Sequence, residues 1–175
     1  MNLDKIKIWA VTDGSQGMIS QVMGLSNHIS SNITEIKTDL IFPWNKLQPR
    51  LLPTYKWIFK NEIPKNDQPN ILISCGRKSV YFSLYCKNKF KNLLNIHIQN
   101  PKISAKNFDY VISPNHDNYH GRNVINSVGA LHHFKKFEQS FNPKLLTCII
   151  GGTNQHYHFN INEANVLCDK LIEIK

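Results

Sequence analysis

The arrangement of strands is the property that this sequence constrains most, because short apolar segments alternate with helix-forming segments. Residues 5–12 (KIKIWAVT) predict a strand, and the glycine-bearing turn DGSQG follows at 13–17. Residues 18–30 carry apolar side chains near 3.6-residue spacing, which predicts a helix, and the alternating residues 33–41 predict a second strand. Strand, helix and strand in this order favour parallel pairing, since parallel strands need a crossover connection. We therefore predict an α/β protein with an open parallel sheet.

The same alternation continues through the rest of the chain. Further strands are predicted at residues 70–74, 94–99, 110–113, 123–127 and 145–150, and further helices at 79–87, 134–140 and 163–172. Polar residues or glycines recur just after the strands, namely Asp13, Gly14, Gly76, Arg77, Gln99, His116, Asp117, Gly129, Gly151 and Gly152. The carboxyl ends of parallel strands line one edge of a sheet, where ligands bind. A ligand cleft is therefore expected at that edge.

Residues 42–62 interrupt this alternation. Pro43, Pro49 and Pro53 prevent a long helix, yet the segment is rich in Trp, Tyr, Leu and Phe, with basic residues interleaved. The favoured interpretation is a pair of short helices that covers the sheet. The alternative is an amphipathic surface for a lipid-like acceptor or a membrane interface, where Trp and Tyr anchor and Lys meets head groups.

The composition describes a folded protein with one domain, or one domain and part of another. The chain has 175 residues, and its 41% hydrophobic content argues against disorder. No apolar run is long enough for a membrane span, and charged residues interrupt the start where a signal peptide would be apolar. We therefore expect a cytoplasmic protein, with peripheral attachment to the inner face of the membrane as an alternative. The cysteines form no C-x-x-C pair and are expected to be buried thiols: Cys75, Cys86, Cys148 and Cys168.

The formal net charge of +9 raises the question of an anionic partner. Lys, Asn and Ile are abundant throughout, and such a bias also arises from an AT-rich coding sequence. The most pointed segment is 77–106, which holds six lysines, one arginine and no acidic residue. We interpret it as a solvated face, with a patch for anionic lipid or a contact to a phosphate backbone as alternatives. Aromatic residues do not interleave with it in a recognition motif, so no nucleic-acid partner is expected.

Two strand ends are candidates for phosphate binding. Residues 145–159 (LLTCIIGGTNQHYHF) give a strand, a Gly-Gly turn and a polar cap before a helix, which offers backbone N–H groups to an anion. The alternative is that these glycines only allow a tight turn. Arg77 follows Gly76, and its planar guanidinium suits a phosphate or a carboxylate. Its alternative role is a surface ion pair with an acid such as Asp13.

Several motifs of nucleotide-binding and metal-binding enzymes are missing from the sequence. There is no G-x-x-x-x-G-K-[ST], DGSQG is not G-x-G-x-x-G, and Asp39 lies within a strand instead of after it, which disfavours P-loop NTPases and dehydrogenases. No D-x-D supplies a carboxylate pair for a metal-bound sugar nucleotide, and the histidines at 116, 120, 156 and 158 lack further ligands at conventional spacing. We therefore expect no metal and no cofactor. His116 and Asp117 are candidates for acid–base chemistry.

An ordered set of motifs resembles a known family. The motifs are D-G-x-x-G with Q-x-x-G-L at 13–25, C-G-R at 75–77, I-Q-N-P at 98–101, P-N-H-D at 114–117, S-V-G-A-L-H at 127–132 and I-G-G-T-N-Q-H-Y at 150–157. Together they resemble the mitochondrial-fission Elm-type family, whose bacterial members are often labelled nucleoside-diphosphate-sugar epimerases. The chain departs from the family pattern at Ser15, where a basic residue is usual, and at Asn100 and Asn115, where acids are usual.

The resemblance implies a GT-B glycosyltransferase-like fold, in which two Rossmann-like domains face each other across a cleft. Residues 1–142 would form the GT-B-like N-terminal domain, with a Rossmann-like open parallel sheet. Residues 143–175 would form the first βα unit of a second, truncated nucleotide-binding domain, which a separate chain would complete. The implied function is transfer of a sugar from a nucleotide-sugar donor to an acceptor, for which a lipid-linked molecule is one candidate. This chain by itself is expected to be inactive.

The resemblance also implies a set of site residues. The catalytic residues would be Asp13, His116 and Asp117, with Asp13 or His116 as the base. The residues that bind substrate or phosphate would be Gly14, Gly17, Gln21, Gly76, Arg77, Gln99, Gly129, Gly151, Gly152, Thr153 and Asn154. A second hypothesis, from another class, is a non-catalytic interaction protein that binds anionic membrane through residues 44–60 and 77–106.

Overall fold

The computed structural model describes residues 5–51, 54–64, 67–134, 148–150 and 158–173. The chain divides into two compact units, Met1–Lys135 and Lys136–Lys175, and each is described by itself. The division falls a little before the predicted boundary at 142. The assignment of the second unit to a nucleotide-binding domain stays a prediction.

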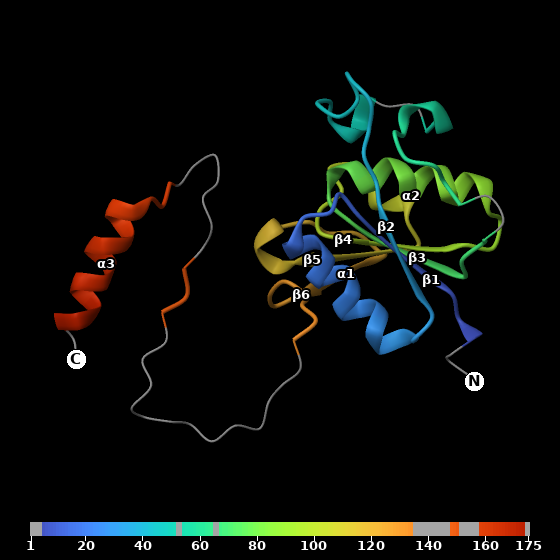
Figure 1. Cartoon of the computed structure of the whole chain (residues 1–175). Coiled ribbons are helices and arrows are strands. Elements are labelled where there is room, and N and C mark those ends of the chain that lie inside the picture. The colour runs from blue at the N-terminus through green and yellow to red at the C-terminus, as the bar shows by residue number, and fades with distance from the viewer. Residues whose placement is uncertain (1–4, 52–53, 65–66, 135–147, 151–157, 174–175) are drawn as a thin grey trace. The chain divides into compact units, whose positions relative to one another are not determined.

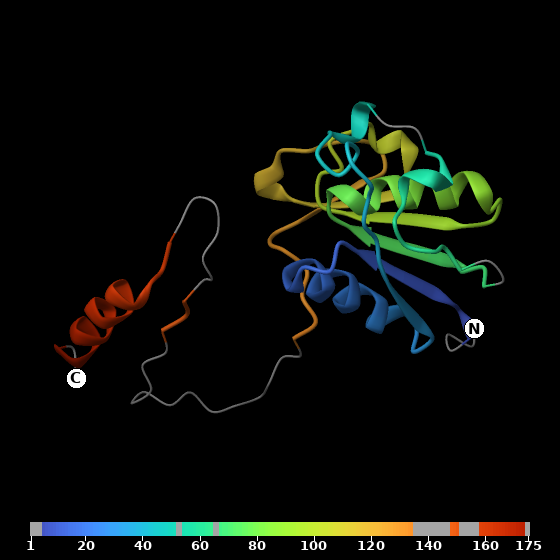
Figure 2. The ribbon, with the colours of Figure 1, turned by 45° about the horizontal axis from the view of Figure 1, so that its top comes forward.

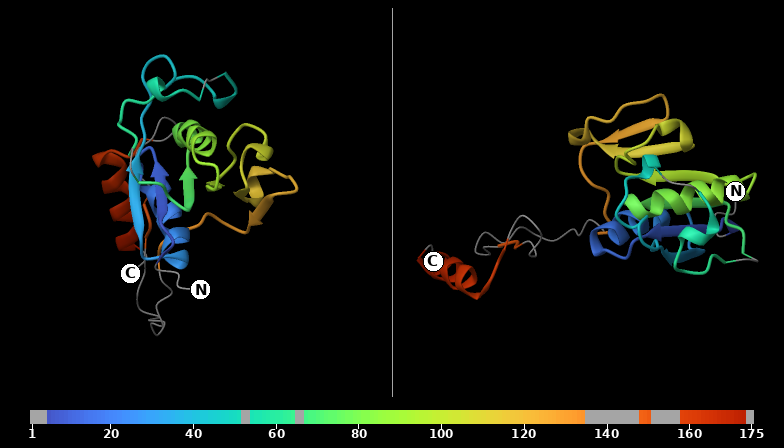
Figure 3. Two further views of the ribbon diagram at one scale, coloured as in Figure 1. Left: turned by 90° about the vertical axis from the view of Figure 1, so that its right-hand side faces the viewer. Right: turned by 90° about the horizontal axis from the view of Figure 1, so that it is seen from above.

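The first unit is built on one six-stranded sheet in which every neighbouring pair is parallel. The strands are β1 (Ile8–Thr12), β2 (Ile33–Lys37), β3 (Ile71–Cys75), β4 (Leu94–Ile98), β5 (Tyr110–Pro114) and β6 (Val124–Ser127). Their order across the sheet is β2-β1-β3-β4-β5-β6, from the blue strands at one side to the orange strand at the other (Figure 3). The predicted α/β class and Rossmann-like parallel sheet are confirmed.

Two helices cover opposite faces of this sheet (Figures 1 and 2). Helix α1 (Gln16–Ile29) packs on β1 and β3 from one side, and α2 (Arg77–Lys89) packs on β1, β3 and β4 from the other. Side chains of β1 alternate between the two cores, with Ile8 on the α1 side and Trp9 on the α2 side. All residues of β1 and β3 are buried, which explains their continuous apolar runs.

The segment between β2 and β3 folds onto the α2 side of the sheet. It contains two short 3₁₀ turns, η2 (Pro49–Leu51) and η3 (Lys56–Ile58), drawn in teal beyond α2 in Figure 1. Ile58 and Phe59 are buried in the same core as Trp9. The predicted pair of short helices is therefore confirmed.

The second unit has one described helix, α3 (Ile161–Glu173), which confirms the predicted C-terminal helix. Asn160 and Glu163 cap its start reciprocally, because the Asn160 side chain accepts from Glu163 N and the Glu163 carboxylate accepts from Asn160 N at 2.6 Å. The strand predicted at 145–150 is not found in its described part, since residues 148–150 pair with no described strand. The helix predicted at 134–140 lies almost wholly outside the described residues.

No helix among the described residues is long and apolar enough to cross a membrane.

The prediction that the four cysteines are buried is right for two of them. Cys75 and Cys86 are buried, and burial raises the pKa of each thiol to about 12. Cys148 and Cys168 are exposed, because neither lies against a described core.

Candidate functional site

The carboxyl ends of the parallel strands bring most of the predicted site residues to one edge of the sheet. Asp13 and Gly14 follow β1, and Gly76 and Arg77 join β3 to α2. Gln99 follows β4, whereas His116 and Asp117 lie in the 3₁₀ turn η5 (Asn115–Asp117) after β5. Gly129 comes after β6. The loops differ in what they contact, and only some of these residues share a pocket.

A pocket of about 300 Å³ lies where the loops after β4 and β5 meet α1. Its lining residues are Gln21, Gln99, Asn100, Lys102, Pro114, His116, Asp117 and Ala130. Four of them were predicted as site residues from the sequence. Such a pocket, with a few convergent polar groups at the carboxyl ends of the strands, is the usual place for a ligand in an α/β fold.

Asp117 is held in a fixed position in this pocket. Its Oδ2 accepts hydrogen bonds from Ser113 Oγ at 3.1 Å and from Asn100 N at 3.3 Å. Its Oδ1 lies 3.8 Å from Nε2 of His116, whose side chain is 73% exposed. The carboxylate is therefore oriented by the end of β5 and by the loop after β4, while the exposed imidazole beside it can contact a ligand. With a carboxylate this close, an imidazole can act as a general base that removes a proton from a hydroxyl group.

Gln21 supplies the second polar group of the pocket. The residue is only 8% exposed, and its Nε2 donates to Gly17 O at 3.3 Å. Its Oε1 is buried and has no hydrogen-bond partner among the described residues. A buried carbonyl oxygen without a partner is costly in a folded protein. Gln21 therefore brings an unsatisfied hydrogen-bond acceptor to the wall of the pocket.

Gln99 has an unusual backbone conformation. Its φ is +77°, in the left-handed region that glutamine rarely adopts, and its N–H donates to Ile112 O at 2.8 Å. Strained residues of this kind concentrate at functional sites, where the surrounding structure holds them in place. The backbone therefore supports the prediction that Gln99 belongs to the site.

The loop after β1 forms a different local structure. The Asp13 carboxylate accepts from Ser15 N at 3.0 Å, and Gly14 N donates to Thr12 Oγ1 at 3.1 Å. Gly14 has a φ of +93° and lines a separate pocket of about 270 Å³ with Lys37. Asp13 is not among the residues that line the pocket of Asp117. Of the two predicted bases, only His116 is in that pocket.

Arg77 uses its guanidinium within the protein. Nη1 donates to Leu47 O and Nη2 to Asn45 O, each at 2.5 Å, so the planar fork ties the segment after β2 to the start of α2. The ion pair with Asp13 is not among the described contacts. Two of the five N–H groups of the guanidinium are thus donated to backbone carbonyl groups. Phosphate binding by Arg77 therefore stays a prediction that its contacts do not favour.

Comparison with known proteins decides the family. A family model described as "Mitochondrial fission ELM1" matches residues 16–175. The chain belongs to this family. It is also similar to "Uncharacterized protein RP120" of Rickettsia prowazekii (strain Madrid E), with 29% identity over 116 residues, which are 64% of this chain and 32% of that protein. The match thus spans about a third of that relative's length, and no solved structure matches.

The structure explains one glycine of the sequence motifs that resemble the ELM1 family. A side chain at Gly24 in α1 would overlap the backbone carbonyl of His132, which lies in the motif after β6. Nearby, His133 Nδ1 is 2.8 Å from Ser20 Oγ. Two motifs that are far apart in the sequence therefore meet along α1. The second of these motifs also contributes Ala130 to the lining of the Asp117 pocket.

Sequence reasoning missed Asn100 and Lys102 as site residues. Asn100 was noted only as a departure from the family pattern, and Lys102 only as one lysine of a long run. Gly17, also predicted, lies in the first turn of α1 and does not line the pocket of Asp117. The predicted residues Gly151, Gly152, Thr153 and Asn154 lie outside the described residues. Among those that are described, no group of three or more His, Cys, Asp or Glu side chains could hold a metal ion.

Proposed function

We propose that this ELM1-family chain belongs to a GT-B-like glycosyltransferase, and that its first unit binds the sugar acceptor. The observation that carries the proposal is the pocket where Gln21, His116 and Asp117 converge, with the carbonyl oxygen of Gln21 buried and unpaired. A hydroxyl group of an acceptor satisfies this oxygen as a hydrogen-bond donor. The resemblance of the motifs to the Elm-type family, which implies a GT-B-like enzyme, supports the same proposal.

In the proposed reaction, an acceptor hydroxyl attacks the anomeric carbon of the donor sugar. The bond from that carbon to the nucleoside diphosphate breaks, and the diphosphate leaves with the bonding electrons. His116 takes the proton of the hydroxyl group, and Asp117 orients and stabilises the imidazolium at 3.8 Å. The residues Gly151–Asn154 are the predicted site for the departing diphosphate, since a Gly-Gly turn before a helix favours an anion.

Binding is the direct test of the acceptor site. The isotope-labelled chain is titrated with methyl glycosides of glucose, mannose and N-acetylglucosamine, and amide shifts are followed by NMR. We expect the largest shifts at Gln21, Gln99 and Asn100, including the Gln21 side-chain amide. The proposal is wrong if no glycoside in the panel moves these signals.

Turnover tests the base. Because the chain is expected to be inactive by itself, release of nucleoside diphosphate from UDP- and GDP-sugars is measured in the presence of the chain that completes the second domain, with each acceptor that binds. General-base catalysis contributes about 10²–10⁴-fold to a rate, so His116→Gln is expected to reduce turnover within that range. His120→Gln is the matched control, because His120 is exposed nearby and its Nε2 faces Asn118 Oδ1 instead of the pocket. Equal losses in the two variants would remove His116 from the mechanism.

A second candidate function is peripheral binding to an anionic membrane, and an exposed aromatic cluster favours it. Phe42, Tyr55 and Trp57 are 77%, 61% and 54% exposed, although each is large and apolar. Trp57 meets Trp44 edge-on at 4.7 Å between ring centroids and stacks on Tyr55 at 6.3 Å. Exposed Trp and Tyr next to lysines are typical of residues that sit at a membrane interface.

Co-sedimentation with vesicles tests this second candidate. Binding to phosphatidylcholine vesicles that contain phosphatidylserine is expected for the chain and reduced in Trp57→Ser. Tyr110→Ser is the control, because Tyr110 is an exposed aromatic residue on β5, outside the cluster. Absence of binding by the unsubstituted chain would exclude the candidate.

A further inference from the structure

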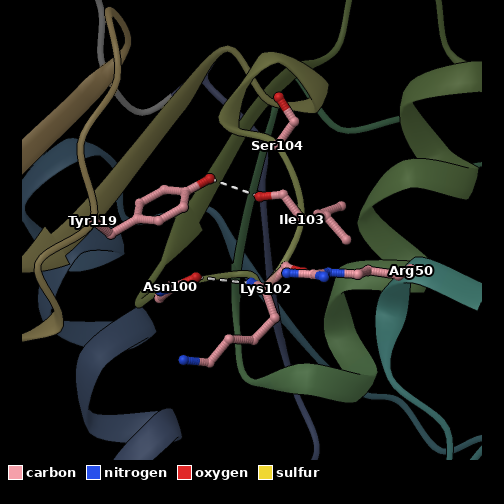
Figure 4. A pocket seen from close by; sticks show the side chains of 6 residues that line it. All are labelled: Arg50, Asn100, Lys102, Ile103, Ser104 and Tyr119. Carbon is pink, nitrogen blue, oxygen red and sulfur yellow. Dashed lines mark hydrogen bonds between the residues drawn. The ribbon is translucent and has the colours of Figure 1, made fainter.

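A second pocket lies beside the one that contains Asp117. Its volume is about 660 Å³, and Arg50, Asn100, Lys102, Ile103, Ser104 and Tyr119 line it (Figure 4). A smaller hollow of about 260 Å³ adjoins it and is lined by Gln48, Arg50 and Lys102. Both linings include Arg50 and Lys102, and neither includes a carboxylate. The pocket is therefore positively charged.

Some lysines of the first unit already have acidic partners. Lys78 pairs with Asp39 at 2.7 Å, and Lys87 pairs with Asp109 at 2.5 Å. The lysine run 77–106 is thus no continuous patch. Among the described residues, by contrast, the terminal nitrogens of Arg50 and the amine of Lys102 have no acceptor. Two unpaired cations in one pocket repel each other unless an anion lies between them.

The walls of the pocket are held by hydrogen bonds. Arg50 Nε donates to Lys102 O at 3.3 Å, and Lys102 N donates to Asn100 Oδ1 at 2.9 Å. On the far side, Tyr119 OH donates to Ile103 O at 2.7 Å, and burial raises the pKa of Tyr119, so this hydroxyl stays a neutral donor. Figure 4 shows the Arg50 guanidinium beside the backbone of Lys102, whose amine extends away from it. One hydrogen bond therefore orients the arginine, and the lysine is free to turn toward a ligand.

We propose that Arg50 and Lys102 bind a phosphate-type oxyanion in this pocket. A fixed guanidinium offers two parallel N–H groups to an oxyanion, an ammonium adds a mobile positive charge, and Ser104 adds a hydroxyl donor. Asn100 and Lys102 also line the Asp117 pocket, so one ligand that carries a phosphate and sugar hydroxyl groups reaches both. The anion site does not rest on the sugar-transfer proposal, because it uses neither His116 nor Asp117.

The test compares charge-matched variants with two probes. Inorganic phosphate is titrated into the labelled chain and followed by NMR, and vesicles of phosphatidylcholine with phosphatidic acid are tested by co-sedimentation. Arg50→Gln and Lys102→Gln are compared with Lys106→Gln, which removes the same charge from an exposed neighbour that does not line the pocket. Thermal unfolding confirms that all three variants remain folded.

We expect phosphate to shift the amides of residues 100–104, with affinity lowered at least about tenfold in Arg50→Gln and Lys102→Gln but retained in Lys106→Gln. Saturable binding of phosphate alone identifies a free phosphate compound as the ligand type. Binding of vesicles alone, with the same dependence on Arg50 and Lys102, identifies a lipid headgroup. The proposal is overturned if neither probe binds, or if Lys106→Gln weakens binding as much as the other two variants.

Discussion

Acid should destabilise the first unit through one buried histidine, His97 on β4. The residue is 1% exposed, its Nδ1 lies 2.8 Å from Ser74 Oγ, and its ring packs 5.1 Å from that of Phe108. Burial lowers the pKa of His97 to about 3, because no charge in its surroundings compensates the lost hydration of an imidazolium. His97 is therefore still neutral in the native state at a pH where the same histidine of an unfolded chain takes up a proton.

The sign and size follow from the difference between the two states. In the unfolded chain the pKa is about 6.5, so on acidification the unfolded state takes up a proton first and gains free energy. The contribution of His97 is thus complete above about pH 6.5 and is lost as the pH falls toward about 3. Linkage gives a loss of about 2 kcal/mol in the free energy of unfolding between about pH 7.5 and about pH 5. Asp39, whose pKa is lowered by hydrogen bonds from Lys60 and Lys78, adds its loss only at more acidic pH.

Urea unfolding at a series of pH values measures this loss. Trp9, Trp44 and Trp57 all lie in the first unit, so their fluorescence reports its unfolding. His97→Gln keeps a polar side chain but cannot titrate, and it should flatten the dependence between about pH 7.5 and about pH 5, whatever its effect at neutral pH. His120→Gln, an exposed control, should keep the wild-type slope. Parallel curves for the wild type and His97→Gln would refute the reasoning.

Three further substitutions test backbone strain and the role of Arg77, each by urea unfolding. Gly76→Ala should lower the free energy of unfolding by about 1–3 kcal/mol, because the backbone angles of Gly76, φ +94° and ψ 160°, are almost confined to glycine. Gly129→Ala is the control and should change the free energy of unfolding little, because a Cβ added at Gly129 meets open space. Gln99→Gly should raise it by about 1 kcal/mol by relieving a φ of +77° and should weaken glycoside binding; a loss of stability would contradict the strain argument. Arg77→Lys should lower the free energy of unfolding by about 1–3 kcal/mol, because an ammonium cannot donate to both carbonyl groups in the geometry of the planar guanidinium. A structural role for Arg77 also predicts that this variant binds phosphate as the wild type does.

The order of elements could be read from the sequence because the strands are short, apolar and separated by turn residues. β1 and β3 are buried on both faces, so their apolar runs are unbroken. Boundaries were less accurate: α1 begins at Gln16 and α2 at Arg77, each two residues before the predicted start. Helix starts depend on local backbone geometry, such as Ser15 in an extended conformation, which periodicity does not reveal.

The site was only partly readable, for a different reason. That Gln99, His116 and Asp117 lie near one another could be predicted because strand ends of a parallel sheet converge, and the three residues line one pocket. The partners of Arg77 could not, since the carbonyls of Asn45 and Leu47 lie some thirty positions earlier and only the folded chain brings them to α2. The hydrogen bond from Arg50 to the Lys102 carbonyl group is non-local in the same way.

The distribution of backbone strain links the two pockets. Gln99, Lys102 and Asn118 are the non-glycine residues with positive φ in the described part of the chain, and all three lie in the loops after β4 and β5. Asparagine adopts this conformation at little cost, but glutamine and lysine lose about 1–2 kcal/mol each relative to glycine. Selection for stability alone favours glycine at 99 and 102. The side chains kept there line the pockets of Asp117 and Arg50, so the strain is best explained by what these side chains bind.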